Sequence, residues 1–292
     1  MSFHLKIVYN EIVLQNGGGV KREVSGMYIE KINLKLKYQT IGEISYVVGA
    51  VCCPEDGDAA LYITDDVSVA KQLRDSGEAV LVHLHSGNAD QNFSEFTFAV
   101  EKPEELDEEY VEKVWLRLKG LPWHILETDR LFVRETVVED VEAFFYIYSE
   151  PSITEYMEDL YPDVEEEKQY VRDYIEKVYT FFEFGVWTVV EKESGAVIGR
   201  AGISYREGFD MPELGFVIGV PWQGKGYATE VCSAVLDYAR EQLAFTEVQA
   251  LVEPENSVSL HLCAKLGMER VEQVSVKGKE YVRLVRRVGQ AD

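Results

Sequence analysis

The sequence is poor in cysteine and in basic residues. Its 292 residues contain 4 Cys, at positions 52, 53, 232 and 263, with no Cys-x-x-Cys pair and no disulfide framework, so we expect a reducing compartment. There are 29 Lys and Arg against 52 Asp and Glu, a formal net charge of −23. This excess of acid argues against nucleic acid as a partner, because phosphates need basic residues, and against an anionic membrane surface.

Long apolar runs are also missing. No stretch approaches the roughly 20 apolar residues of a membrane span. The first residues, MSFHLKIVYNEIVLQ, lack the charged flank and apolar core of a signal peptide. We therefore expect a cytoplasmic protein with no membrane partner. At 46% hydrophobic residues the chain can bury a sizeable core, and its length suits two domains.

The first part of the sequence alternates between expected strands and helices. The strands are expected at 60–64, 78–85 and 96–100, and the helices at 67–77 and 106–120. Because such alternation builds parallel sheets, residues 1–122 are predicted to form a smaller α/β domain with a short parallel sheet. Before residue 50, FHLKIVYNEIVLQ and EKINLKLKYQTI predict strands separated by the turn signal NGGG. GLPWHILETDR, residues 120–130, is predicted to be a linker.

Residues 127–292 are predicted to form the second domain. Its expected elements are a strand at 130–136, helices at 138–149 and 164–182, a hairpin around KESG, a strand at 213–220, a helix at 226–243, a strand at 247–254, a helix at 257–267 and a last strand at 279–288. The helix at 226–243 has a continuous apolar stripe at helical spacing, made by Ala228, Val231, Cys232, Val235, Leu236, Ala239 and Leu243. This face is expected to pack on a sheet.

The stretch PWQGKGYATE, residues 221–230, places two glycines where this helix should begin. A helix start exposes unpaired backbone N–H groups and a partial positive charge, which together favour an anion. Glycine lets a phosphate approach the backbone without a side-chain clash. Neither the GxxxxGK[ST] spacing of a P-loop nor the GxGxxG of a dinucleotide fold is present, and glycine-rich turns before helices are often purely structural.

QGKGYA resembles the Q/R-x-x-G-x-G/A signature of the GNAT superfamily of acyl-CoA-dependent N-acyltransferases. NSVSLHLCAKLGM, residues 256–268, resembles a later element of that family, with Met268 where Phe is usual. The order of elements over about 165 residues is also similar. The sequence GKGYATE resembles that of the branch that contains ribosomal-protein N-terminal acetyltransferases. The resemblance implies a mixed, mostly antiparallel sheet with flanking helices over 127–292. It also implies acetyl-CoA as the cosubstrate.

The resemblance implies roles for particular residues. The CoA pyrophosphate would lie on the amides of Gln223, Gly224, Lys225, Gly226, Tyr227 and Ala228. The pantetheine arm would pair with the backbone around Phe216, Val217 and Ile218, where the strands holding Val217 and Ala250 would splay. A backbone N–H near Ile218 would donate to the thioester carbonyl, and Asn256 would hold the arm from the other side. Recognition by backbone groups suits a chain of net charge −23.

Proton transfer is less clearly assigned. Glu213 begins the strand that leads to the thioester and suits a general base, directly or through water; a strand-end surface charge is the alternative. Ser259 could donate to the leaving sulfur, or only cap its helix. In many members of the family a Tyr at the position of Cys263 acts as the acid for the leaving thiolate. For Cys263 itself we favour the role of a small apolar residue of the helix. Glu230 is expected to stabilise the helix start, and His261 to lie on the surface.

The first domain offers weaker signals. ALYITDD with the following segments resembles the later half of a haloacid dehalogenase-type phosphatase, where an acidic pair, here Asp65 and Asp66, holds Mg²⁺. The aspartyl nucleophile strand is missing, so we expect a non-catalytic domain rather than a phosphatase. His83 and His85 share one face of a strand, a geometry that can hold a metal. No Cys or Asp cluster accompanies them in the sequence, and we expect no metal site.

The leading hypothesis is an N-acetyltransferase that acts on a primary amine, as a small molecule or a peptide N-terminus. The alternative is a non-catalytic module that senses acyl-CoA; a homodimer is left open. SEPSITEYMEDLYPDVEEEKQY, residues 149–170, combines acids with Tyr156 and Tyr161 in the segment that forms one wall of the acceptor cleft in the family. Acids and aromatic faces suit a cation, which favours a polycationic acceptor. They could also simply solubilise a loop.

Overall fold

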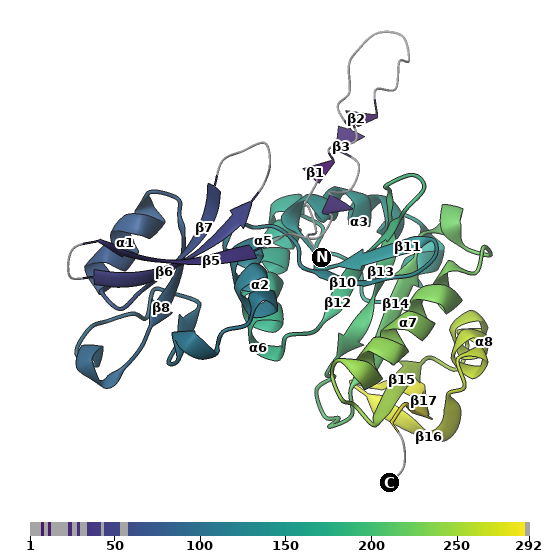
Figure 1. Ribbon diagram of the computed structural model, residues 1–292. Helices are drawn as coiled ribbons and strands as arrows, with labels where there is room; N and C mark the ends of the chain where they lie inside the picture. Colours follow the sequence, from purple (N-terminus) through teal and green to yellow (C-terminus); the bar gives the residue numbers. More distant parts are fainter. Residues whose placement is uncertain are drawn as a thin grey trace. The chain divides into compact units, whose positions relative to one another are not determined.

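A computed structural model of the chain describes residues 58–289 and, before them, only the backbone of six strands (Figure 1). These strands are β1 (Ile7–Val8), β2 (Glu11–Ile12), β3 (Glu23–Val24), β4 (Tyr28–Ile29), β5 (Leu34–Ile41) and β6 (Ile44–Cys52). From residue 58 on, the chain divides into two compact units between Trp123 and His124, and each is considered by itself.

The first unit is built on a five-stranded sheet in the order β5-β6-β7-β8-β9. β7 (Asp58–Thr64), β8 (Ala79–His83) and β9 (Ala99–Val100) run parallel, which confirms the short parallel sheet that the alternating pattern predicts. β6 pairs with β5 and β7 in the antiparallel sense, so the complete sheet is mixed. β6 was not predicted as a strand. The predicted strand at 96–100 is reduced to its last two residues.

Two helices cover opposite faces of this sheet. Alternate residues of β7 and β8, among them Leu61 and Leu81, pack with α2 (Glu108–Leu118). The intervening residues Val80 and Val82 pack with Ala70 of α1 (Val67–Asp75). This division follows from the two-residue period of a strand. Two short 3₁₀ turns, Ser86–Asn88 and Pro103–Glu105, complete the unit.

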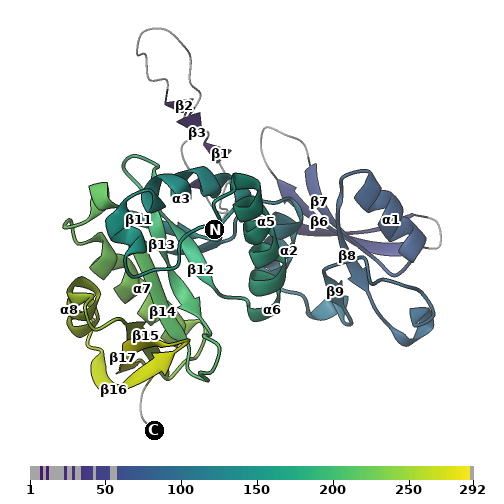
Figure 2. The same cartoon turned by 180° about the vertical axis from the view of Figure 1, so that it is seen from behind.

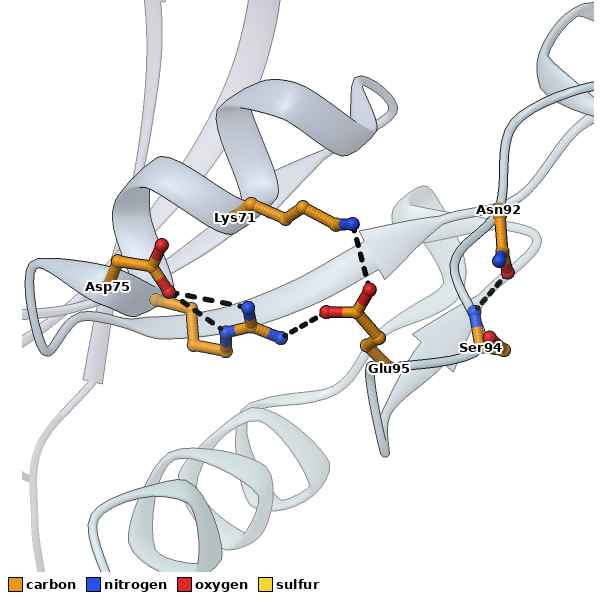
Figure 3. A network of polar contacts seen from close by, with 6 residues as sticks. Lys71, Asp75, Asn92, Ser94 and Glu95 are labelled. Atoms are coloured by element: carbon orange, nitrogen blue, oxygen red, sulfur yellow. Dashed lines mark hydrogen bonds and ion pairs between the residues drawn. The ribbon is translucent and has the colours of Figure 1, made fainter.

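An exposed polar network joins α1 to the loop before β9 (Figure 3). Glu95 accepts from Lys71 at 2.8 Å and from Arg74 at 3.2 Å, and Arg74 also contacts Asp75. All of these side chains are at least two-fifths exposed. Since exposed pairs of this kind contribute little to stability, the network orients the loop, and the packed faces of the sheet hold the unit together.

The second unit is built on an eight-stranded sheet in the order β10-β11-β12-β13-β14-β15-β17-β16. The strands are β10 (His124–Glu127), β11 (Leu131–Arg134), β12 (Val186–Glu191), β13 (Val197–Ser204), β14 (Glu213–Ile218), β15 (Glu247–Val252), β16 (Glu269–Val276) and β17 (Lys279–Arg287). Only β14 and β15 run parallel. The predicted mixed, mostly antiparallel sheet is therefore confirmed.

Helices cover both faces of this sheet. α3 (Val141–Tyr148), α5 (Val164–Tyr174) and α6 (Thr180–Phe182) lie on one side, and α7 (Tyr227–Glu241) and α8 (Ser257–Lys265) on the other (Figures 1 and 2). The short helix α4 (Pro151–Thr154) contacts α3. A 3₁₀ turn at Val138–Asp140 precedes α3, and a π-helical turn at Ile175–Tyr179 joins α5 to α6. The apolar stripe of α7 is buried as predicted, with Val231 and Leu236 fully inaccessible.

Three details differ from the expectation. The predicted linker at 120–130 contains β10, which pairs with β11 and so belongs to the sheet. β16 was missed, because nearly all of its side chains are exposed and its valines stand among charged and polar residues, so no buried apolar face marks it as a strand. The short helix α4 was also missed. None of the helices in the described part of the chain is long and apolar enough to cross a membrane.

Candidate active site

The segment between β14 and α7 is an open loop that depends on glycine. A 3₁₀ turn over Val220–Trp222 leads to Gln223, and α7 begins at Tyr227. Gly224 and Gly226 have φ angles of +73° and +85°, which cost a residue with a β-carbon about 1–2 kcal/mol. A β-carbon on Gly224 would meet nothing within 4 Å, so the surface of the loop is open there.

The loop presents a row of unused backbone amides. Among the described residues, none accepts a hydrogen bond from the N–H groups of residues 224–229. The first paired amide is that of Glu230, which donates to Gly226 O at 3.1 Å. Unpaired donors at a helix start carry a partial positive charge. This arrangement fits a pyrophosphate, which can accept several N–H bonds at once.

Two side chains, one from the loop itself and one from outside it, fix the loop in this conformation. Gln223 Nε2 donates to Ile218 O at 2.8 Å, and Arg130 Nη1 donates to Lys225 O at 3.0 Å. The Arg130 guanidinium also lies 4.3 Å from the centre of the Tyr227 ring. The loop is thus held from behind while its amides stay free, and Arg130 adds positive charge beside Lys225.

Glu230 takes part in this support. It accepts from Thr128 Oγ1 at 2.6 Å and from Arg130 N and Nε at 3.1 and 2.7 Å. Partial burial pushes the pKa of Glu230 upward, but the hydrogen bonds from Thr128 and Arg130 outweigh it and hold the pKa below the usual glutamate value. Glu230 remains charged at neutral pH and ties the turn between β10 and β11 to α7.

β14 and β15 separate soon after they meet. Their parallel pairing contains one pair of opposed residues, Glu213 and Gln249. On its other edge β14 is paired with β13 along its whole length. The splay expected between the strands of Val217 and Ala250 is therefore confirmed, and it leaves backbone groups of both strands without ladder partners.

The direction of those groups follows from one hydrogen bond. Gly219 N–H donates to Ile198 O of β13 at 2.8 Å. In an antiparallel ladder, successive residues point their N–H and C=O groups alternately toward and away from the partner strand. The amides of Phe216 and Ile218 therefore point into the gap, whereas those of Val217 face β13. A ligand in the gap could pair with Phe216 and Ile218 as with a missing strand.

α8 begins on the far side of the gap. Asn256 caps it, with Oδ1 accepting from Ser259 N at 3.0 Å, and its Nδ2 has no hydrogen-bond partner among the described residues. Ser259 lies in the first turn and is partly exposed. Burial raises the pKa of Cys263 to about 11, so this thiol stays protonated inside the core. His261 is exposed, as expected.

Glu213 is less available than its position in the sequence suggests. Its carboxylate accepts from Arg206 Nε and Nη2 at 2.6 and 2.7 Å, and the residue is 7% exposed. Both carboxylate oxygens are thus occupied by one guanidinium in a two-pronged, charge-assisted contact. The pair lies where β14 and β15 meet, so it also closes one end of the gap.

A row of side chains crosses the face of the sheet that α3 covers. Arg134, Thr188, Arg200 and Val217 oppose one another on four neighbouring strands. Arg134 forms a buried pair with Asp140 at 2.7 Å. Arg200 has no carboxylate partner in the described part of the chain, and its Nε is buried without a hydrogen bond. Its guanidinium lies 4.8 Å from the centre of the Phe144 ring.

The acidic segment between α3 and α5 borders this region. Glu150, Glu155, Glu158, Asp159 and Asp163 are all exposed, although Asp163 also caps α5. A hydrogen bond to Glu155 raises the pKa of Tyr156, and the charges of Glu255 and Glu253 add to the effect. Tyr156 therefore lies within electrostatic range of Glu253 and Glu255, which lead into α8, and Glu158 lies within that range of Arg206, the partner of Glu213.

Comparison with known proteins assigns the second unit. Residues 130–269 match the family described as acetyltransferase (GNAT) domain. Residues 130–269 are a GNAT acetyltransferase domain. The uncharacterized N-acetyltransferase p20 of Bacillus licheniformis is 29% identical over 150 residues, which cover 50% of this chain and 82% of the relative.

Two further proteins resemble the GNAT domain. The [ribosomal protein uS5]-alanine N-acetyltransferase of Escherichia coli (strain K12) is 36% identical over 91 residues, which cover 30% of this chain and 45% of the relative. The crystal structure of RimL, the ribosomal L7/L12 alpha-N-protein acetyltransferase, is 12% identical with a TM-score of 0.50, and covers 57% of this chain and 95% of that one. The last likeness shows the fold alone.

Three arginines of the GNAT domain were not identified from the sequence. Arg130 supports the loop, Arg206 holds Glu213, and Arg200 faces α3 without an acidic partner. Arg130 meets partners about 100 positions later in the chain, so no local spacing reveals its role. Arg200 could have been suspected, because a charged residue in an otherwise apolar strand needs a reason.

Proposed function

We propose that the GNAT domain transfers an acetyl group from acetyl-CoA to a primary amine. The observation that carries this proposal is the row of unpaired amides at residues 224–229, next to a gap between two parallel strands. A phosphate-binding helix start beside an open strand edge suits a ligand with a phosphate end and an extended amide arm. CoA has both, and its thioester supplies the acetyl group.

The residues of this chain have distinct tasks in the proposed reaction. The free amides of Gly224, Lys225, Gly226, Tyr227 and Ala228 would hold the pyrophosphate. The amide of Gln223, expected to join them, donates to Val220 O at 3.1 Å, so Gln223 would support the loop through its side chain. Phe216, Ile218 and the amide nitrogen of Asn256 would orient the arm, with Val217 shaping the wall of the gap. The Ile218 N–H would donate to the thioester carbonyl oxygen as negative charge develops there.

Catalysis then rests mainly on positioning. We propose that the amine loses its proton to water and that Glu213 acts as a positioning residue, because Arg206 occupies both of its oxygens. Ser259 is the proposed hydroxyl donor to the leaving sulfur. A thiolate leaves readily, so this contribution is expected to be small.

Two features favour a peptide N-terminus with nearby basic residues as the acceptor. The exposed acids of residues 150–163 attract positive charge. Arg200 has no carboxylate partner among the described residues and shares a hydrogen bond with Tyr148, and we propose that a carbonyl oxygen next to the reactive amine accepts from its remaining donors. A peptide has that oxygen, whereas a polyamine does not. The relative from E. coli, whose name refers to an alanine of a ribosomal protein, agrees with this choice.

A thiol-release assay tests the proposal on the full chain. We expect acetyl-CoA to be consumed fastest with a basic peptide that has a free N-terminus, more slowly with spermidine, and not with the same peptide blocked at its N-terminus. Tight CoA binding without release on any amine would favour the alternative, a non-catalytic acyl-CoA sensor.

The proposed organisation is a GNAT catalytic domain at 127–292 that follows a non-catalytic domain at 1–122. We propose a cytoplasmic location, because the sequence has no disulfide framework. A homodimer remains open. Mg²⁺-dependent phosphatase activity is not proposed for the first unit, because Asp66 Oδ1 accepts hydrogen bonds from the amides of Ser68 and Val69, at 2.8 and 3.0 Å.

A further inference from the structure

The first unit brings Asp65, His83 and His85 together at one edge of its sheet. Asp65 follows β7. His83 ends β8, the parallel strand beside it, and His85 follows two residues later, just before the turn at Ser86–Asn88. Ligands of open α/β sheets commonly bind at the carboxyl ends of parallel strands. One ligand atom from each of the three residues lies within 4.8 Å of the other two. The sequence revealed the two histidines, and the fold adds the carboxylate.

A buried asparagine fixes the backbone that carries these residues. Asn88 is 3% exposed. Its Nδ2 donates to Asp65 O at 3.0 Å and to His83 O at 2.8 Å, and its Oδ1 accepts from His85 N at 2.9 Å. All three residues are therefore held relative to one another by a single side chain that solvent does not reach.

The side chains of Asp65, His83 and His85 are partly exposed to solvent and form few hydrogen bonds. His85 Nε2 lies 3.0 Å from Asp65 Oδ2, and the His83 ring stands 4.9 Å from the His85 ring, centre to centre. Among residues 58–289, none forms a hydrogen bond to a nitrogen of the His83 ring. Asp65 and His85 are 43% and 37% exposed, so an ion could reach them and retain a water ligand.

We propose that Asp65, His83 and His85 bind a divalent transition metal such as Zn²⁺. Zn–N and Zn–O bonds of 2.0–2.2 Å place tetrahedral ligands roughly 3.3 Å apart, and the Asp65–His85 separation already matches that spacing. Two imidazoles with one carboxylate favour Zn²⁺, Co²⁺ or Ni²⁺ over Mg²⁺, which prefers oxygen. Three protein ligands leave a fourth position open to water or substrate.

One existing contact opposes the metal. Gly87 N–H donates to His85 Nδ1 at 3.1 Å, which places the proton of a neutral ring on Nε2, toward Asp65. A metal on Nε2 displaces that proton to solvent and requires one on Nδ1, so the Gly87 bond is lost. Such a bond is worth about fivefold in an equilibrium constant. This is small beside the affinity that three correctly spaced ligands provide.

Metal titration of the untagged, chelator-treated full chain tests the site. We expect one equivalent of Co²⁺ to bind with visible absorption bands of a low-symmetry, histidine-ligated ion, and one equivalent of Zn²⁺ to displace it. His83→Ala and Asp65→Asn should each weaken binding at least tenfold. His261→Ala, which removes an exposed histidine of the other unit, should leave it unchanged.

Two outcomes would overturn the site. One is Co²⁺ binding that is equally strong in His83→Ala and Asp65→Asn. The other is weak binding that Ca²⁺ competes away as well as Zn²⁺ does, which would indicate general attraction to an acidic chain. Circular dichroism of each variant shows that the fold is intact, so loss of binding cannot be mistaken for unfolding.

Discussion

A β-carbon at position 226 would approach the Arg130 guanidinium only to 3.5 Å, so space does not require Gly226. The requirement comes from its φ of +85° and from the amides that surround it. We predict that Gly226→Val weakens CoA binding by at least a hundredfold while the fold survives. The bulky side chain strains the loop and obstructs the phosphate. Isothermal titration with CoA measures the change.

Gly77→Val is the matched control for this variant. Gly77 has a φ of +82°, a β-carbon there would meet nothing within 4 Å, and it lies in the first unit after α1. It should lose similar stability, about 1–2 kcal/mol, and bind CoA normally. Equal CoA affinities for Gly226→Val and wild type would contradict the assignment of the loop.

Variants of the Arg206–Glu213 pair can distinguish two roles for Glu213, positioning of β14 and general base, which the sequence left open. If Glu213 only positions β14, Glu213→Gln and Arg206→Met should each lower the free energy of unfolding by about 2 kcal/mol, a value between those of exposed and buried ion pairs. Each should also lower kcat less than tenfold. Thermal unfolding and steady-state rates are measured for both. A fall in kcat above a hundredfold in Glu213→Gln alone, with the pH profile losing its lower limb, would restore Glu213 as the general base.

At the scale of elements, Glu230 joins the β10–β11 turn to α7. Its pKa is lower in the folded chain than in the unfolded chain, so it stabilises the fold above the unfolded pKa of about 4.3. This contribution is lost as the pH falls through the folded pKa. Because hydrogen bonds to a partly exposed charge are screened, we expect a contribution of about 1 kcal/mol.

We therefore predict that Glu230→Gln lowers Tm by about 2–4 °C at pH 7. The difference from wild type should shrink as the pH is lowered from 5 to 3. Thermal melts across that range measure it. Glu193→Gln removes an exposed carboxylate near the same surface and should change Tm little at any pH. A difference that stays constant from pH 7 to pH 3 would rule out the charged carboxylate as the cause.

The elements also show what a sequence can reveal. α7 and its glycine loop were predictable, because apolar spacing and two glycines are local signals. β16 was not, because its residues face solvent and its pairing with β17 is what makes it a strand. The same distinction between local and long-range signals applies to the site residues. The loop residues form one contiguous segment, whereas Asp65 and His85 become neighbours only because β7 and β8 pair.

At the scale of the whole molecule, the net charge of −23 should act on a cationic acceptor. Acids near the gap raise its local concentration, and salt screens that effect over a Debye length of about 10 Å at 0.1 M. Acetyl-CoA is itself anionic and is expected to gain nothing from this field. In the proposed site its binding would rely on the amides of the loop, which act at contact distance and are screened less.

We predict that kcat/KM for a basic peptide falls severalfold between 50 and 300 mM salt, while that for a neutral amine barely changes. The double variant Glu155→Gln, Glu158→Gln should lower both the rate and its dependence on salt, because it removes two exposed carboxylates beside the gap. Glu101→Gln with Glu109→Gln removes the same charge from exposed positions of the first unit and should leave the rate nearly unchanged. If both double variants behave alike, only total charge matters, and the acidic segment between α3 and α5 does not select the acceptor.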